Sequence, residues 1–85
     1  MHTRTVVVGA AVGLHVRPAQ VIAEAVEASG AEVRIARPGE EPVDAGSALL
    51  IMTLGAGPGD RVEISSEDAG ALDAIAALVE RDLDA

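Results

Sequence analysis

The chain has 85 residues, a length that suits one small domain with a single hydrophobic core. Fourteen acidic residues outweigh six basic ones, all of them arginines, and the formal net charge is −8. The chain has no basic stripe and no Phe, Tyr or Trp on which bases could stack, so we exclude DNA and RNA as partners. It also has no cysteine, which excludes disulfides and thiolate metal sites and fits a reducing compartment.

The apolar content predicts a folded domain without a membrane segment. Hydrophobic residues make up 49% of the chain, enough to build a core despite the net charge. The longest apolar runs, residues 6–14 and 48–57, are interrupted by glycine or threonine and are too short to cross a bilayer. No export signal is recognisable at the N-terminus. We therefore expect a cytoplasmic protein.

The first third of the chain predicts a strand followed by a helix. A cluster of β-branched residues indicates a strand over residues 3–8. Residues 17–29 then show the helical spacing of apolar positions, which are Ala19, Ile22, Ala23 and Val26. Pro18 suits the first turn of this helix, and Gly30 suits its C-terminal end.

The middle of the chain predicts a hairpin and a short second helix. Apolar and polar residues alternate over residues 31–37, the pattern of a strand with one buried face. Turn-forming residues follow, and residues 43–45 are the short returning strand. Residues 48–54 fit a strand or a helix by length, but the scarcity of β-branched residues favours a helix.

The last third predicts a loop, a strand and a final helix. Residues 55–59 are rich in glycine, but they lack the third glycine of a nucleotide-binding motif and precede a strand, so we interpret them as a plain connection. Val62 and Ile64 mark the last strand. Ser65 and Asp68 offer a capping box. The apolar set of the final helix is Leu72, Ile75, Ala76, Val79 and Leu83.

These elements follow the order β-α-β-β-α-β-α and predict an α+β fold of one domain over residues 1–85. The strands alternate polar with apolar residues, so one face of the sheet meets water and the other is covered. We expect an open-faced β-sandwich, in which a four-stranded antiparallel sheet carries three helices on one face. We also expect a monomer.

Most catalytic and metal-binding classes find no support in the sequence. No serine stands in the nucleophile-elbow pattern that a Ser-His-Asp relay would need. The histidines are only His2 and His15, and the carboxylates lie on what we expect to be solvated faces. We therefore expect no metal and no cofactor.

Residues 13–19 read Gly-Leu-His-Val-Arg-Pro-Ala and place His15 just before a predicted helix. A helix N-terminus directs backbone N–H groups and the positive end of its dipole outward, so it attracts an anion. A neutral imidazole has a nucleophilic nitrogen that could accept a phosphoryl group, and Arg17 could offer paired donors to its oxygens. The alternative is an ordinary loop histidine that caps the helix or packs at its start.

Two segments, residues 13–19 and residues 43–47, resemble the signatures of HPr, the histidine phosphocarrier of the bacterial sugar phosphotransferase system. Length, element order and the spacing of the two segments agree over nearly the whole chain. The resemblance implies that His15 accepts a phosphoryl group on Nδ1 from phosphorylated enzyme I and passes it to sugar-specific enzyme II proteins. It also implies that Arg17 stabilises the transferred phosphate.

The resemblance further implies a docking surface formed by the outer parts of the first two helices. On this chain it comprises Val16, Gln20, Ala48, Leu49 and Met52. Leu49 and Met52 are three residues apart and share a helix face, which we expect to be exposed, whereas Ile51 and Leu54 should point to the core. The alternative is that all four are core residues.

Ser47 and the overall function each allow an alternative interpretation. Ser47 corresponds to a serine that a regulatory kinase modifies in some members of the family, but as a helix N-cap it needs no further role. The rival functions are a regulatory binding module acting through Ser47 and a carrier for a dihydroxyacetone or nitrogen-related branch. Because the chain is acidic, Arg17 would have to supply the positive field around the phosphate, with Arg4 and Arg37 as candidates to add to it.

Overall fold

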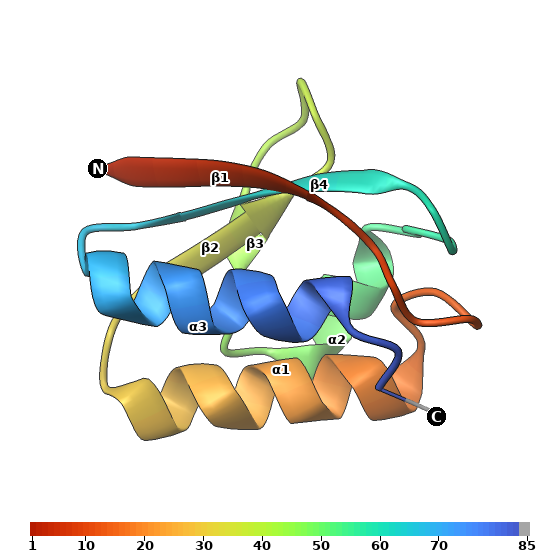
Figure 1. Cartoon of the computed structure of the whole chain (residues 1–85), viewed down its shortest axis with the longest axis horizontal. Coiled ribbons are helices and arrows are strands. Elements are labelled where there is room, and N and C mark those ends of the chain that lie inside the picture. Colours follow the sequence, from red (N-terminus) through yellow and green to blue (C-terminus); the bar gives the residue numbers. More distant parts are fainter. Residues whose placement is uncertain (84–85) are drawn as a thin grey trace.

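In the computed structural model, which describes residues 1–83, a four-stranded antiparallel sheet forms one layer and three helices form the other (Figure 1). The strands, in the sheet order β1-β4-β2-β3, have the bounds β1 His2–Val7, β4 Arg61–Ser66, β2 Val33–Ala36 and β3 Val43–Asp44. The helices are α1 Val16–Ser29, α2 Ala48–Thr53 and α3 Ala69–Glu80. The predicted element order and open-faced α+β fold are confirmed.

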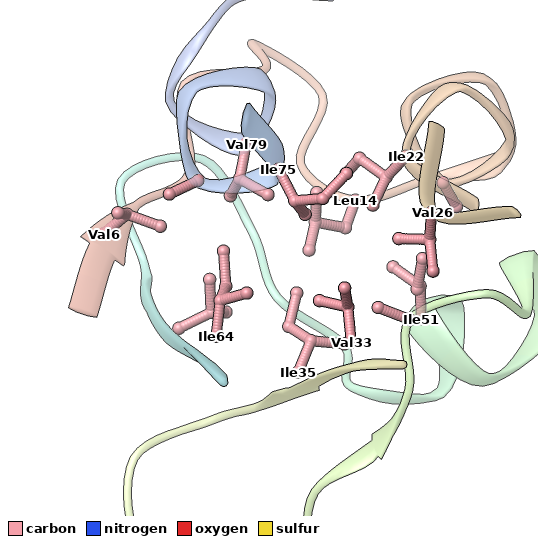
Figure 2. Close-up of a cluster of buried hydrophobic side chains, with 14 of the residues drawn as sticks. Val6, Leu14, Ile22, Val26, Val33, Ile35, Ile51, Ile64, Ile75 and Val79 are labelled. Carbon is pink, nitrogen blue, oxygen red and sulfur yellow. The ribbon is translucent and has the colours of Figure 1, made fainter. Parts of the chain in front are cut away.

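The sheet buries one face because alternate residues of its central strand are apolar. In β4, Val62 and Ile64 are fully buried, while Arg61 is exposed and points to the open face. Ile64 lies opposite Ile35 of β2 in the antiparallel register, so the two side chains share the covered face. Figure 2 shows Ile64 and Ile35 in one aliphatic cluster with side chains from the helices.

The helices bury the faces that their spacing predicts. Pro18 joins the predicted set on α1, and Ala71 joins the predicted set on α3. One member of the α3 set was placed wrongly, because α3 ends at Glu80 and Leu83 lies beyond it, half-buried against the core. No helix within residues 1–83 is long and apolar enough to cross a membrane.

The N-terminal cap of α3 differs from the predicted capping box. Asp68 is the N-cap, and its carboxylate accepts a hydrogen bond from the Ala71 amide at 3.0 Å. Ser65 lies within β4 and does not cap the helix. The neighbouring Ser66, which is buried, donates to the Glu32 carbonyl oxygen and accepts from the Asp68 amide. The alternation of β4 turns Ser66 inward, so this serine, rather than Ser65, supports the cap.

Several predicted boundaries shift by one or a few residues, among them those of the first strand, which spans His2–Val7 instead of residues 3–8. The second strand is shorter than residues 31–37, and α1 begins at Val16 instead of residue 17. Pro18 is therefore the third helical residue. This position is compatible with proline because the first amides of a helix have no intrahelical partner, so its missing N–H costs no hydrogen bond.

Candidate functional site

His15 is the N-cap of α1. Its backbone is extended, with φ −80° and ψ −169°, and its carbonyl oxygen accepts the first hydrogen bond of the helix from the Ala19 amide at 2.9 Å. The imidazole makes no capping hydrogen bond, and the residue is exposed. The side chain of His15 therefore neither caps the helix nor packs at its start, so the alternative interpretation of this residue is wrong. The backbone holds the residue in place and leaves the ring at the surface.

The first turn of α1 can complement an anion beside this ring. The amides of Val16 and Arg17 precede the first intrahelical hydrogen bond, and Pro18 has no N–H. The first turn contains no acidic side chain that would oppose an incoming anion. Arg17 adds a guanidinium to the same exposed turn. These features together provide an imidazole nucleophile and positive charge at the end of one helix.

A loop from the other side of the fold holds the segment that leads to His15. The 55–60 loop binds this segment at both of its ends. At the start, the Val8 amide donates to the Asp60 carbonyl at 2.8 Å, and the Gly59 amide donates to the Val8 carbonyl at 3.0 Å. At the end, the Leu14 amide donates to the Ala56 carbonyl at 3.0 Å. Figure 1 shows the two loops on the same side of the molecule.

This contact corrects the interpretation of residues 55–59 as a plain connection. The loop does not bind phosphate as a nucleotide-binding loop would, but it positions the residue before His15. Leu14 is buried in the core cluster, so its side chain and its amide are both fixed. The sequence did contain a signal for this contact, namely the several glycines of the 55–60 loop together with Gly13. Glycines permit the close approach of two backbones.

Gly13 and Gly9 permit this close packing. Gly13 has φ +79°, and a Cβ there would lie 2.7 Å from the Ala56 carbonyl oxygen. The Gly9 amide donates to the Val79 carbonyl at 3.0 Å, and a Cβ on Gly9 would lie 1.9 Å from the Glu80 carbonyl oxygen. The segment before His15 thus lies directly against the 55–60 loop and the C-terminal end of α3.

The predicted docking residues are divided between surface and core. Val16 and Leu49 are 55% and 69% exposed, as expected for a contact surface, and Gln20 is also exposed. Ala48 and Met52 are only half-buried and pack against the core, so the expectation that Met52 is exposed is only partly met. Ile51 and Leu54 are buried as predicted, and the sequence analysis missed Leu50, which is 38% exposed.

Ser47 is the N-cap of α2 and lies away from His15. Its Oγ accepts a hydrogen bond from the Leu50 amide at 3.2 Å, which confirms its predicted capping role. Its neighbour Gly46 adjoins Val26, since a Cβ on Gly46 would lie 3.6 Å from Val26 Cγ1. Val26 follows His15 by about 16 Å along the helix axis at 1.5 Å per residue. The structure does not bring Ser47 and His15 together.

The arginines expected to add positive charge near the site are paired with acidic groups. Arg4 Nη1 lies 3.0 Å from Asp73 Oδ1 of α3. Arg37 Nη2 lies 3.7 Å from Asp60 Oδ2, and its Nε lies 4.0 Å from Glu40. Each of these arginines therefore has an acidic partner of its own, whereas Arg17 is the arginine that lies in the first turn of α1. Within the described residues, no group of three or more His, Cys, Asp or Glu could hold a metal ion.

Comparison with known proteins connects this arrangement to a family. The family model for the PTS HPr component phosphorylation site matches residues 2–81. The chain belongs to the HPr family of the phosphotransferase system. It is 40% identical over 87 aligned positions to phosphocarrier protein HPr of Streptomyces coelicolor, with 99% of this chain and 94% of the relative covered.

Solved structures of HPr proteins have the same fold. The phosphocarrier protein HPr from Bacillus anthracis is 32% identical, with a TM-score of 0.83 over 92% of this chain and 95% of that one. The HPr-C-His structure from Thermoanaerobacter tengcongensis is 26% identical, with a TM-score of 0.87 over 100% of this chain and 98% of that one. The HPr fold therefore accounts for the whole described chain.

We predict that Gly13→Ala destabilises the protein more than Gly39→Ala. Both glycines have φ near +80°, so alanine costs about 1 kcal/mol at either position. Only at Gly13 does the new Cβ meet backbone atoms, whereas nothing lies within 4 Å of it at Gly39. The additional loss should be about 1 kcal/mol or more in urea denaturation. Equal losses would show that the 55–60 loop moves away without cost.

Proposed function

We propose that the chain is a phosphocarrier in which His15 accepts a phosphoryl group from phosphorylated enzyme I and passes it to sugar-specific enzyme II proteins. The observation that supports this proposal is the exposed imidazole at the N-cap of α1 in a chain of the HPr family. This imidazole makes no capping hydrogen bond, and Arg17 follows two residues later. This carrier is stoichiometric, because each molecule holds one phosphoryl group between two partners and does not turn over substrate alone.

In the proposed transfer, a lone pair on His15 Nδ1 attacks phosphorus. The bond from phosphorus to its donor atom on enzyme I breaks as the new phosphorus–nitrogen bond forms, and the bonding electrons return to the donor atom. A neutral imidazole supplies the lone pair without first losing a proton. The phosphoryl group then leaves His15 in the same manner when a nucleophile on enzyme II attacks.

The helix end would stabilise charge on the phosphoryl oxygens during this transfer. The dipole of α1 places partial positive charge at its N-terminus, where the amides of Val16 and Arg17 precede the first helical hydrogen bond. Arg17 can place two N–H donors on two oxygens, a geometry that a lysine does not reproduce. Preorganised donors of this kind lower the barrier because they need little rearrangement in the transition state.

The docking surface that we propose for enzyme I and enzyme II combines exposed apolar side chains of α1 and α2. Val16 and Leu49 form its apolar part, together with Leu50. Glu24 and Glu27 continue the exposed stripe of α1 away from His15, at helical spacing from Val16. A partner that covers this surface should have an apolar centre and should avoid acidic groups opposite the two glutamates.

The central test is incubation with enzyme I and phosphoenolpyruvate, followed by intact mass analysis. We expect one acid-labile phosphoryl group on the wild-type protein and on His2→Ala, and none on His15→Ala. His2 is the matched control because it is also exposed but lies at the start of β1. Labelling that persists in His15→Ala would place the acceptor elsewhere.

Arg17→Lys should slow transfer from enzyme I by about tenfold, because the loss of one of two paired donors costs roughly 1.4 kcal/mol in the transition state. The folding stability should change little. Arg34→Lys is the control, since Arg34 lies on the open face of the sheet and pairs with Glu32. Transfer rates measured at several salt concentrations decide the question, and equal rates for all three proteins would remove Arg17 from the site.

Leu49→Glu should raise the KM for enzyme I by about tenfold or more, because it places a charge in an apolar contact. Leu49 is a better probe than Met52, which packs against the core and whose substitution would also disturb folding. Val7→Glu is the control: Val7 is 47% exposed but belongs to β1 at the sheet layer. If Leu49→Glu and Val7→Glu both keep the wild-type KM, α2 lies outside the contact.

A further inference from the structure

We propose that Arg37 and Asp60 are positioning residues for the transfer at His15, an inference that rests on the proposed function. They do not contact the phosphoryl group in this scheme. They hold the 55–60 loop in one shape, and this loop in turn fixes the segment before His15.

Arg37 follows β2 and binds the loop at both of its ends. Its Nη1 donates to the Gly55 carbonyl oxygen at 3.1 Å and to the Leu54 carbonyl oxygen at 3.4 Å, where α2 ends. Its Nη2 lies 3.7 Å from Asp60 Oδ2, at the other end of the loop. One guanidinium therefore spans the loop, and its charge also suits the carbonyl groups at the C-terminus of α2.

Asp60 connects the arginine to the interior of the loop. The same oxygen, Oδ2, that faces Arg37 accepts a hydrogen bond from the Gly57 amide at 2.8 Å. The Asp60 amide in turn donates to the Gly57 carbonyl at 3.1 Å. Gly55 and Gly59 have positive φ values of 64° and 80°, so the unconstrained loop has many accessible conformations. The arginine and the aspartate restrict a chain that is otherwise flexible.

The shape of the loop determines where the segment before His15 lies. Asp60 and Gly59 bind Val8 through their backbones, and Ala56 binds the amide of Leu14. The next residue is His15, whose carbonyl oxygen begins α1. If the loop loosens, the Leu14 amide loses its hydrogen-bond acceptor. The backbone of His15, which carries the imidazole, is then no longer held in one position. A displacement near 1 Å can reduce the rate of a positioned reaction by about a hundredfold.

The test compares Arg37→Gln, Asp60→Asn and the double variant with wild type and with Arg4→Gln. Arg4→Gln is the matched control because it also removes an ion pair between two elements, with Asp73 of α3, but has no contact with the 55–60 loop. Two measurements are made below the unfolding temperature of every variant: transfer kinetics from enzyme I, and NMR signals of the imidazole rings. His2 is an internal reference for the second measurement.

We expect Arg37→Gln and Asp60→Asn each to lower the maximal transfer rate by about threefold or more with little change in KM. The double variant should lose less than the product of the two single effects, because both residues constrain one loop. The ring signals of His15 should shift or broaden, while those of His2 stay in place. Arg4→Gln should behave as wild type in both measurements.

Unchanged rates in both single variants would overturn the proposal. So would a rate loss without any change in the His15 signals, because the residues would then only stabilise the fold. If Arg37→Gln does not fold, Arg37→Lys and Asp60→Asn carry the same comparison. If wild type accepts no phosphoryl group, the proposed function fails, whereas the NMR comparison on the free proteins still decides whether Arg37 positions His15.

Discussion

The candidate site depends on three backbone hydrogen bonds between the 55–60 loop and the segment that precedes His15. They join residues that are more than forty positions apart in sequence. Val8 makes two of them with Asp60 and Gly59, and Leu14 makes the third with Ala56. Because Leu14 is also buried, the start of α1 is fixed both by hydrogen bonding and by packing. Hydrogen bonds of this kind contribute only about 1 kcal/mol each to stability, but their directionality specifies where the helix begins.

The core beneath this contact is aliphatic apart from one buried serine. Val, Ile, Leu and Ala fill it without aromatic side chains, so each residue buries a modest area and the packing relies on many small contacts. Ser66 is the buried polar side chain of the described core, and both of its hydrogen bonds are satisfied. Such a core fixes the sheet and helices, whereas the loops at the site need their own constraints. Backbone hydrogen bonds and paired charges provide these constraints, and the glycines permit the close approach of the backbones.

Local periodicity was sufficient to predict the elements, the fold class and the buried faces of α1 and α3. It could not predict contacts between loops, because these depend on how distant backbones meet. The role of the 55–60 loop, the pairing of Arg37 with Asp60 and the inward position of Ser66 were therefore missed. The roles proposed for His15 and Arg17 came from the resemblance to a family more than from the residues themselves. The start of α1, which makes His15 the N-cap and puts Arg17 in the first turn, was misplaced by one residue when spacing alone was used.

The three helices differ at their N-termini in a way that bears on function. Ser47 caps α2 and Asp68 caps α3 through side-chain hydrogen bonds, but the N-cap of α1 makes none. A good side-chain cap stabilises a helix by about 1 kcal/mol, so α1 gives up stability that the other two helices gain. Arg17 adds a cation at the positive end of the dipole, which is also unfavourable for the helix alone. Both features become favourable once an anion is present, because a phosphoryl group on His15 would supply the negative charge that the first turn lacks. Among the three described helices, the N-cap without a side-chain hydrogen bond is thus the one at which the transient negative charge of the proposed transfer would be stabilised.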